Sequence, residues 1–222
     1  MRRNVKRSSE WKLYVIVDLA AIGSRDPVQV AAAAIRGGAD AIQLRDKTGP
    51  AKTLCDVARR LLEVTRPSGI PLIINDRADV ALAAGASGVH LGQDDLPLAD
   101  ARRLLGPERL IGRSTHSLEQ ALAAEAEGAD YIGCGPVFPT PTKPDAGSVG
   151  TALVTSVAAR VRIPVVCIGG IDTGNVERVV AAGAVCVAVV RAVCRAADPE
   201  AATRQLKHRL IQSGRARAVH RL

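Results

Sequence analysis

Aromatic residues are scarce in this sequence. The 222 residues include one Phe, one Trp and two Tyr, which together make up 2% of the chain. Proteins that bind single-stranded nucleic acid stack bases on several aromatic rings. We therefore expect no base-stacking surface and no specific nucleic-acid partner.

Paired cysteines and long apolar runs are also missing. The five cysteines are odd in number and show no CxxC spacing, so they predict neither a disulfide framework nor a zinc site. No uninterrupted apolar run approaches the 18 residues needed to span a membrane. Asp18 interrupts the first apolar run and argues against a signal peptide. We expect a cytoplasmic protein that makes no membrane contact.

Acidic residues are lacking near both ends of the chain. The net charge is +8, from 30 basic and 22 acidic residues, but four basic residues precede the first acidic one and six follow the last. Without those ten, 20 basic residues face 22 acidic ones, so the basicity belongs to the ends. We predict a basic arm over residues 1–10, a catalytic domain over 11–212 and a basic tail over 213–222.

The middle of the chain repeats one pattern of strand and helix. Four Ala-rich helical segments end at Gly38, Gly85, Gly128 and Gly183, and an apolar strand follows each. Further strands fit between these repeats, and all of them alternate with helical patterns, which is typical of a parallel sheet. The expected strands are Leu13–Val17, Ala41–Leu44, Leu72–Ile74, Gly88–Leu91, Leu110–Gly112, Tyr131–Gly133, Val165–Ile168 and Cys186–Val190.

Eight such units predict an α/β fold, a single-domain (β/α)8 TIM barrel. We place the last helix at about 199–212. The alternative is an open doubly wound sheet, but the turn after the first strand carries no GxGxxG motif.

Polar residues gather where the predicted strands end. In a barrel of this kind the active site lies at the carboxyl ends of the strands. Gln43, Arg45 and Lys47 alternate there and can point the same way. The same strand ends supply Asn75, Asp76, Asp95, Ser114 and Arg191, together with Gly169 and Gly170.

Two carboxylates from neighbouring strand ends predict a metal site. Asp76 and Asp95 would suit Mg²⁺, which takes few protein ligands and keeps water and phosphate oxygens. The alternatives are a helix cap for Asp76 and a turn role for Asp95. His90 and His116 also follow strands, where a histidine is more often packed and hydrogen-bonded than catalytic.

A proline-rich loop follows the sixth strand. It carries Thr140, Thr142 and Lys143 between prolines. Hydroxyls and an ammonium group suit phosphate oxygens, although a stiff surface loop is the alternative. Gly169 and Gly170 precede a helix start and form a second candidate phosphate site. Together these groups predict an enzyme that joins two phosphorylated small molecules with loss of diphosphate.

Five motifs resemble the thiamine phosphate synthase family. They are QLRDK at 43–47, IND at 74–76, VHLGQDD at 89–95, GPVFPTPTKPD at 135–145 and IGGI at 168–171. The resemblance implies that 4-amino-2-methyl-5-hydroxymethylpyrimidine diphosphate is coupled with 4-methyl-5-(2-phosphoethyl)thiazole to give thiamine phosphate and diphosphate, in a transferase reaction.

The resemblance also implies a role for each site residue. Asp76 and Asp95 would bind Mg²⁺. The residues implied to bind the pyrimidine diphosphate are Gln43, Arg45, Lys47, Asn75, Ser114 and Lys143, and the catalytic ones among them are Arg45, Lys47, Ser114 and Lys143. The residues implied to bind the thiazole phosphate are Thr140, Thr142, Gly170, Val190 and Arg191.

One position departs from the family, and two other functions compete. The family usually has a serine where this chain has Arg191. A related thiazole tautomerase shares the barrel, but its catalytic histidine would fall at Pro136. A ligand-sensing protein without turnover is the competitor from another class, and the candidate metal carboxylates argue against it. Whether the protein forms a homo-oligomer is left open by the sequence.

Overall fold

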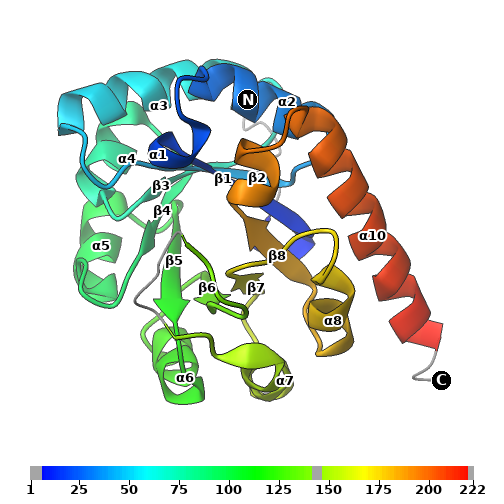
Figure 1. The fold of residues 1–222 in the computed structure, drawn as a ribbon. Helices are drawn as coiled ribbons and strands as arrows, with labels where there is room; N and C mark the ends of the chain where they lie inside the picture. The colour runs from blue at the N-terminus through cyan, green and yellow to red at the C-terminus, as the bar shows by residue number, and fades with distance from the viewer. Residues whose placement is uncertain (1–6, 142–146, 220–222) are drawn as a thin grey trace.

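Eight parallel strands close into a barrel (Figure 1). The computed structural model describes residues 7–141 and 147–219. Each strand pairs with the next, and β1 pairs with β8 to close the ring. The strands are β1 (Leu13–Asp18), β2 (Ala41–Arg45), β3 (Leu72–Asn75), β4 (Gly88–Leu91), β5 (Leu110–Thr115), β6 (Tyr131–Cys134), β7 (Val165–Ile168) and β8 (Cys186–Val189). The (β/α)8 prediction is confirmed, and the open sheet is excluded.

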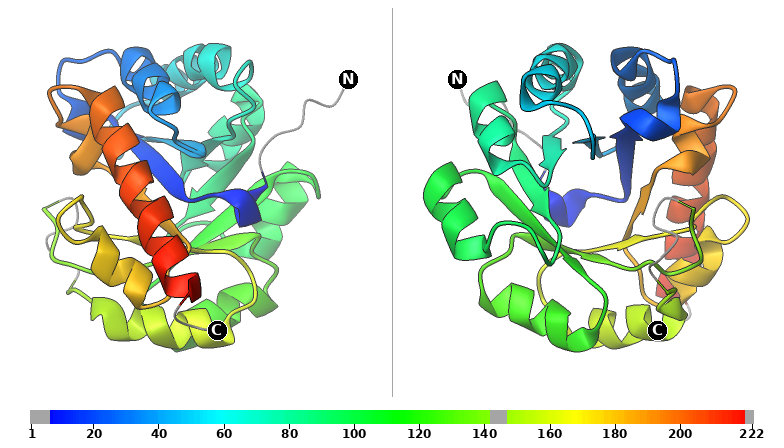
Figure 2. Two further views of the ribbon diagram at one scale, coloured as in Figure 1. Left: turned by 90° about the vertical axis from the view of Figure 1, so that its right-hand side faces the viewer. Right: turned by 60° about the vertical axis from the view of Figure 1, so that its left-hand side comes forward.

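Helices cover the outside of the barrel (Figure 2). They are η1 (Ser8–Glu10), α1 (Leu19–Ile22), α2 (Pro27–Arg36), α3 (Ala51–Thr65), α4 (Ala78–Ala84), α5 (Leu98–Leu105), α6 (Leu118–Ala126), α7 (Gly150–Arg160), α8 (Val176–Ala181), α9 (Arg191–Cys194) and α10 (Pro199–Val219). The start of α2 shows why they form where they do. Asp26 accepts a hydrogen bond from the Val28 N–H, and Pro27 occupies the first helical position. No described helix is long and apolar enough to cross a membrane.

The four repeated glycines turn the chain from helix into strand. Gly38, Gly85, Gly128 and Gly183 all have positive φ angles, as the sequence pattern predicts. At the end of α4, Gly85 is left-handed with φ 72° and its N–H reaches the carbonyls of Ala81 and Leu82.

The core has two layers, one on each side of the strands. On β1, Leu13, Val15 and Val17 belong to the large apolar layer between strands and helices. Tyr14 and Ile16 point the other way, into the barrel, because successive side chains of a strand alternate. Three of the four aromatic residues, Trp11, Tyr14 and Tyr131, gather inside the barrel.

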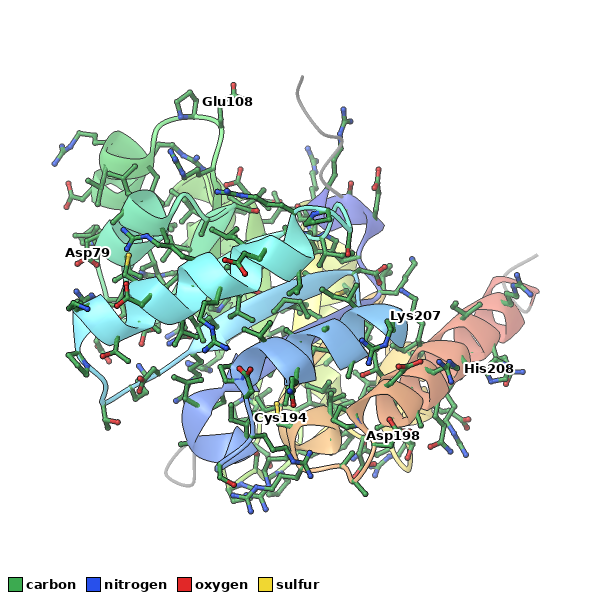
Figure 3. The ribbon with its side chains drawn as sticks, turned by 90° about the horizontal axis from the view of Figure 1, so that it is seen from above. Asp79, Glu108, Cys194, Asp198, Lys207 and His208 are labelled. Atoms are coloured by element: carbon green, nitrogen blue, oxygen red, sulfur yellow. The ribbon has the colours of Figure 1, made fainter. Side chains whose placement is uncertain are left out.

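The last helix connects the C-terminal part of the chain to its first strand. Figure 2 shows α10 running across the outside of the barrel, and it packs against α2 and α8. Lys207 of α10 is labelled in Figure 3, and it forms an ion pair with Asp40, just ahead of β2. The Asp40 carboxylate also accepts the N–H groups of Lys12 and Leu13 at 2.8 and 2.9 Å. This carboxylate therefore joins α10 to the start of β1.

Two element boundaries differ from the sequence prediction by three residues or more. β5 continues to Thr115, so Arg113 and Ser114 lie within the strand, where they pair with Ile132 and Gly133 of β6. α10 continues to Val219 instead of ending near 212, because its last turns contain Ala and Arg, and a single Gly214 costs a helix only about 1 kcal/mol. The division into arm, domain and tail stays a prediction.

Candidate active site

A cavity of about 490 Å³ opens at the carboxyl ends of the strands. Residues from all eight strands line it, together with the segments that follow β6, β7 and β8. The predicted site residues among them are Gln43, Arg45, Asn75, Ser114, Thr140, Gly170, Val190 and Arg191. Thr142 and Lys143 lie outside the described residues.

Arg45 is held in place by a residue that the sequence analysis did not select. Its guanidinium forms an ion pair with Asp18, whose side chain is only 3% exposed. The other oxygen of Asp18 accepts the N–H groups of Ala20 and Ala21 at 3.0 and 3.1 Å, which caps α1. Asp18 thus connects the start of a helix to a predicted substrate-binding cation. Its place at the end of β1 was the signal that could have identified it.

Lys47, Asp76 and Asp95 form a charged cluster beside the cavity. The Lys47 ammonium contacts an Asp76 carboxylate oxygen, and the carboxyl groups of Asp76 and Asp95 interact closely enough that each shifts the pKa of the other. Asp95 also accepts the Gly92 N–H at 2.6 Å. The two carboxylates predicted to share a metal ion therefore meet, although they come from segments after different strands.

Burial and the neighbouring Asp95 raise the pKa of Asp76, against the opposing effect of Lys47. Burial acts on Asp95 in the same direction, but hydrogen bonds from Asp76 and the Gly92 N–H lower the pKa of that carboxyl. Two carboxyl groups in contact disfavour simultaneous ionisation, and a cation between them removes that penalty. No group of three or more acidic, His or Cys residues with metal-site geometry occurs among the described residues. The pair therefore fits a hard cation that takes its other ligands from water or phosphate, as Mg²⁺ does.

The backbone at Asp76 has an unusual conformation. Asp76 has φ 63° and is the only described non-glycine residue with positive φ. Its N–H donates to the His90 carbonyl at 2.7 Å, which fixes the end of β3 against β4. The preceding side chain, Asn75, has a buried Nδ2 with no hydrogen-bond partner among the described residues. Strained backbone and an unmet buried donor are both typical of a ligand site.

The loop after β6 packs against the glycine turn after β7. The Val137 and Phe138 N–H groups donate to the carbonyls of Ile168 and Gly169 at 2.8 and 3.0 Å. A Cβ added at Gly170 would lie 2.6 Å from the Pro139 carbonyl oxygen, and φ is positive at this residue. Only glycine fits this close approach, which brings Thr140 and Gly170 to the same side of the cavity.

A chain of polar side chains crosses the floor of the cavity. Gln43 Nε2 donates to the Tyr14 hydroxyl at 2.9 Å, and the hydroxyls of Tyr14 and Tyr131 lie 3.2 Å apart. His90 links Tyr131 to Ser114, with Nδ1 3.1 Å from the phenol oxygen and Nε2 3.0 Å from Ser114 Oγ. His90 is thus packed and hydrogen-bonded, as the sequence predicts, and the two tyrosines were not anticipated as part of the site.

The comparison with known proteins matches residues 13–193 to the thiamine monophosphate synthase family. This chain belongs to that family. The thiamine-phosphate synthase of Roseiflexus castenholzii is 52% identical over 195 residues, 87% of this chain and 86% of that protein. The thiamine-phosphate synthase of Shouchella clausii is 51% identical over 197 residues, 88% and 94% of the two chains. The resemblance inferred from the five motifs is confirmed.

A solved structure of the same kind shares the fold. The thiamine phosphate pyrophosphorylase from Pyrococcus furiosus superposes with a TM-score of 0.85 at 39% identity, over 93% of this chain and 98% of that one. A 3-hexulose-6-phosphate synthase, at 20% identity and a TM-score of 0.64, shares the barrel alone.

Arg191 stands where the resemblance to the family leads us to expect a serine. It is the first residue of α9, directly after Val190, and it lines the cavity. Its exposed side chain forms no ion pair with any residue that the structure describes. The guanidinium is thus available to an anion in the cavity.

Proposed function

We propose that this member of the thiamine monophosphate synthase family couples 4-amino-2-methyl-5-hydroxymethylpyrimidine diphosphate to 4-methyl-5-(2-phosphoethyl)thiazole, giving thiamine phosphate and diphosphate. The proposal rests on one observation, which is that two sets of candidate anion-binding residues line the same cavity. Gln43, Arg45, Asn75 and Ser114 line one part of it, and Thr140, Gly170 and Arg191 line another. A reaction of two anionic substrates needs two such sets.

Arg45 and Lys47 would bind the diphosphate group, and the family resemblance implies the same role for Lys143, which lies outside the described residues. Arg45 lies at the cavity wall and Lys47 stands beside it. Positive groups positioned before the reaction stabilise the charge that develops on a leaving diphosphate. The Ser114 hydroxyl adds a neutral donor.

We assign Mg²⁺ to Asp76 and Asp95, whose carboxyl groups interact with each other. When bound, the ion would neutralise charge on the diphosphate oxygens and so make this group easier to displace. Besides binding the diphosphate, Lys47 would orient the Asp76 carboxylate through their ion pair. This metal requirement is an expectation from the donor chemistry of the two carboxylates and their resemblance to the family motif.

The arrangement supports a dissociative mechanism. The bond between the pyrimidine methylene carbon and the diphosphate oxygen breaks first, and its electron pair leaves with diphosphate. The amino-substituted ring stabilises the methylene cation, which the thiazole nitrogen then attacks to form the new C–N bond. No proton is transferred in these two steps, so the chain needs residues that bind and orient more than a general base. Both histidines near the cavity are already hydrogen-bonded, His90 to Tyr131 and Ser114, and His116 to the Gly135 carbonyl.

The tautomerase alternative lacks a reacting group at the relevant position. Pro136 lines the cavity where that activity would need a histidine, and it has no side-chain proton to exchange. A synthase of this kind would act in the cytoplasm on small-molecule substrates.

The direct test incubates the purified full-length chain with both substrates and Mg²⁺ and measures thiamine phosphate and diphosphate. We expect equal amounts of the two products. Binding of both substrates without either product would contradict the proposal and favour a ligand-sensing protein. Omission of the thiazole substrate is the control, because thiamine phosphate cannot then form.

A further inference from the structure

The chain of hydrogen bonds under the cavity joins two substrate-binding side chains that do not touch. It runs from Gln43 through Tyr14, Tyr131 and His90 to Ser114, and these residues come from β2, β1, β6, β4 and β5. We propose that this chain is a directional hydrogen-bond relay, in which His90 is the positioning residue that turns the Ser114 hydroxyl proton toward the substrate. The inference deepens the proposed function and rests on it for its kinetic test.

Three members of the relay, Gln43, Tyr14 and Tyr131, are buried, so the phenol protons of the two tyrosines have to find acceptors along the relay. Tyr131 is fully buried, and Tyr14 and Gln43 are 1% and 2% exposed. Burial strongly raises the pKa of both tyrosines, so both phenols keep their protons at neutral pH. A buried hydroxyl proton without an acceptor destabilises the folded protein, so each phenol proton is expected to be hydrogen-bonded.

These protons can be placed in order along the chain. The Gln43 amide nitrogen donates to the Tyr14 oxygen, so the Tyr14 proton goes to the Tyr131 oxygen, 3.2 Å away. The Tyr131 proton then goes to His90 Nδ1, which has to be unprotonated to accept it. His90 therefore carries its proton on Nε2 and donates it to Ser114 Oγ.

The last step decides what Ser114 offers to a ligand. Its oxygen already accepts a proton from His90, so its own proton is available to an acceptor in the cavity. A diphosphate oxygen is such an acceptor. The chain has one alternative state, in which the Gln43 amide is turned over and all four hydrogen bonds reverse. Ser114 would then donate to His90 and would present only lone pairs to an anion, which a diphosphate disfavours.

The barrel is built to allow the contact between His90 and Tyr131. A Cβ added at Gly112 would lie 2.2 Å from Tyr131 Cζ and 2.5 Å from His90 Nδ1. At Gly133 it would lie 3.2 Å from the His90 ring. Any larger residue at Gly112 would displace one of the two rings. The glycines on β5 and β6 therefore leave room for this one hydrogen bond.

The first test reads the histidine tautomer without any assay of activity. Nuclear magnetic resonance of the protein labelled with ¹⁵N-histidine, with His90 assigned by its loss in His90→Asn, distinguishes Nε2–H from Nδ1–H. We expect the Nε2–H form at neutral pH, and a mixture of both forms in Tyr131→Phe. An Nδ1–H or doubly protonated His90 in the unmodified protein would overturn the proposal. If the chain had no synthase activity, this measurement would still decide whether the relay exists.

The second test is kinetic and uses the loss of a single oxygen. Tyr131→Phe keeps the ring and removes the proton donor to His90, so we expect kcat to fall roughly three- to tenfold with KM little changed. In a Ser114→Ala background the same change should have no further effect on kcat, because the hydroxyl group that the relay orients is then absent. A full, additive loss in that background would show that Tyr131 acts by another route.

Two further variants separate positioning from packing. Trp11→Phe alters the same aromatic cluster, with Trp11 5.2 Å from the Tyr14 and Tyr131 rings, but removes no atom of the relay. We expect a normal tautomer and normal kcat for it. His90→Gln retains a donor that reaches Ser114, so it should keep more activity than His90→Asn. Equal loss in Trp11→Phe and Tyr131→Phe would contradict the relay.

Discussion

The guanidinium of Arg45 is paired with the buried carboxylate of Asp18, its register partner on the neighbouring strand β1. The pair lies at the cavity wall, where Arg45 is exposed to a ligand on its other side. The Asp18 carboxylate is buried and also caps α1, so its position is fixed. The ion pair therefore restricts the movement of the Arg45 side chain.

Asp18→Asn should therefore weaken the reaction without unfolding the barrel. The asparagine oxygen can still cap α1, but the charge that holds Arg45 is gone. We expect kcat/KM to fall roughly ten- to hundredfold, in keeping with the roughly 1.5–3 kcal/mol of a charged hydrogen bond, with a small drop in melting temperature. Asp26 likewise caps a helix, α2, and pairs with an arginine, Arg60, but neither residue lines the cavity, so Asp26→Asn is the matched control and should leave kcat/KM unchanged. Equal kinetic effects of the two changes would contradict the role of Asp18.

Metal dependence should follow the protonation of the Asp76 and Asp95 pair. Because the pKa of Asp76 is raised, protons compete with Mg²⁺ more strongly as the pH falls toward that value. We expect the Mg²⁺ concentration for half-maximal activity to rise on acidification, and Asp76→Asn or Asp95→Asn to lose most turnover while circular dichroism stays normal. Full activity in excess chelator would disprove the metal assignment.

Arg191→Ser tests the departure from the family sequence. If the guanidinium binds the thiazole phosphate, the change should raise the Michaelis constant for this substrate and make it less dependent on salt. The Michaelis constant for the pyrimidine substrate serves as the internal control and should stay constant. An unchanged or lower constant for the thiazole phosphate would mean that Arg191 points elsewhere when the substrate is bound.

The ion pair between Lys207 and Asp40 should matter for stability. The two side chains are 18% and 2% exposed, and removal of one partner from a buried pair typically costs about 3–5 kcal/mol. We expect Lys207→Ala to lower the free energy of unfolding by about 3 kcal/mol in urea titrations. Lys52→Ala, which breaks an exposed pair with Asp56, should cost well under 1 kcal/mol. Similar losses for both variants would show that the Asp40 carboxylate is satisfied by its backbone donors alone.

The barrel was predictable because its strands are marked locally. Glycines such as Gly85 and Gly183 end helices through positive φ, and a short apolar run follows each. The boundaries of β5 were not predictable in the same way. Arg113 and Ser114 are polar, and only the pairing with β6 makes them part of a strand.

The site was predictable where a residue stands at a strand end and carries a familiar function. Gln43, Arg45 and Asn75 line the cavity as expected. Tyr14 and Tyr131 were missed, since an aromatic residue within an apolar run predicts only a core. Their contact across the barrel, between β1 and β6, depends on closure of the sheet. Asp18 was missed for a related reason, because its partner comes from the next strand.

Closure of the ring by β1 and β8 has a consequence for the order of events during synthesis. Leu13 of β1 pairs with Val187 of β8, and Asp40 forms its ion pair with Lys207 of α10. One edge of β1 therefore stays unpaired until β8 has been synthesised. Exposed strand edges invite pairing with other chains. The growing polypeptide is thus most prone to aggregation just before β8 emerges, and chaperones that shield strand edges would be needed most at that moment.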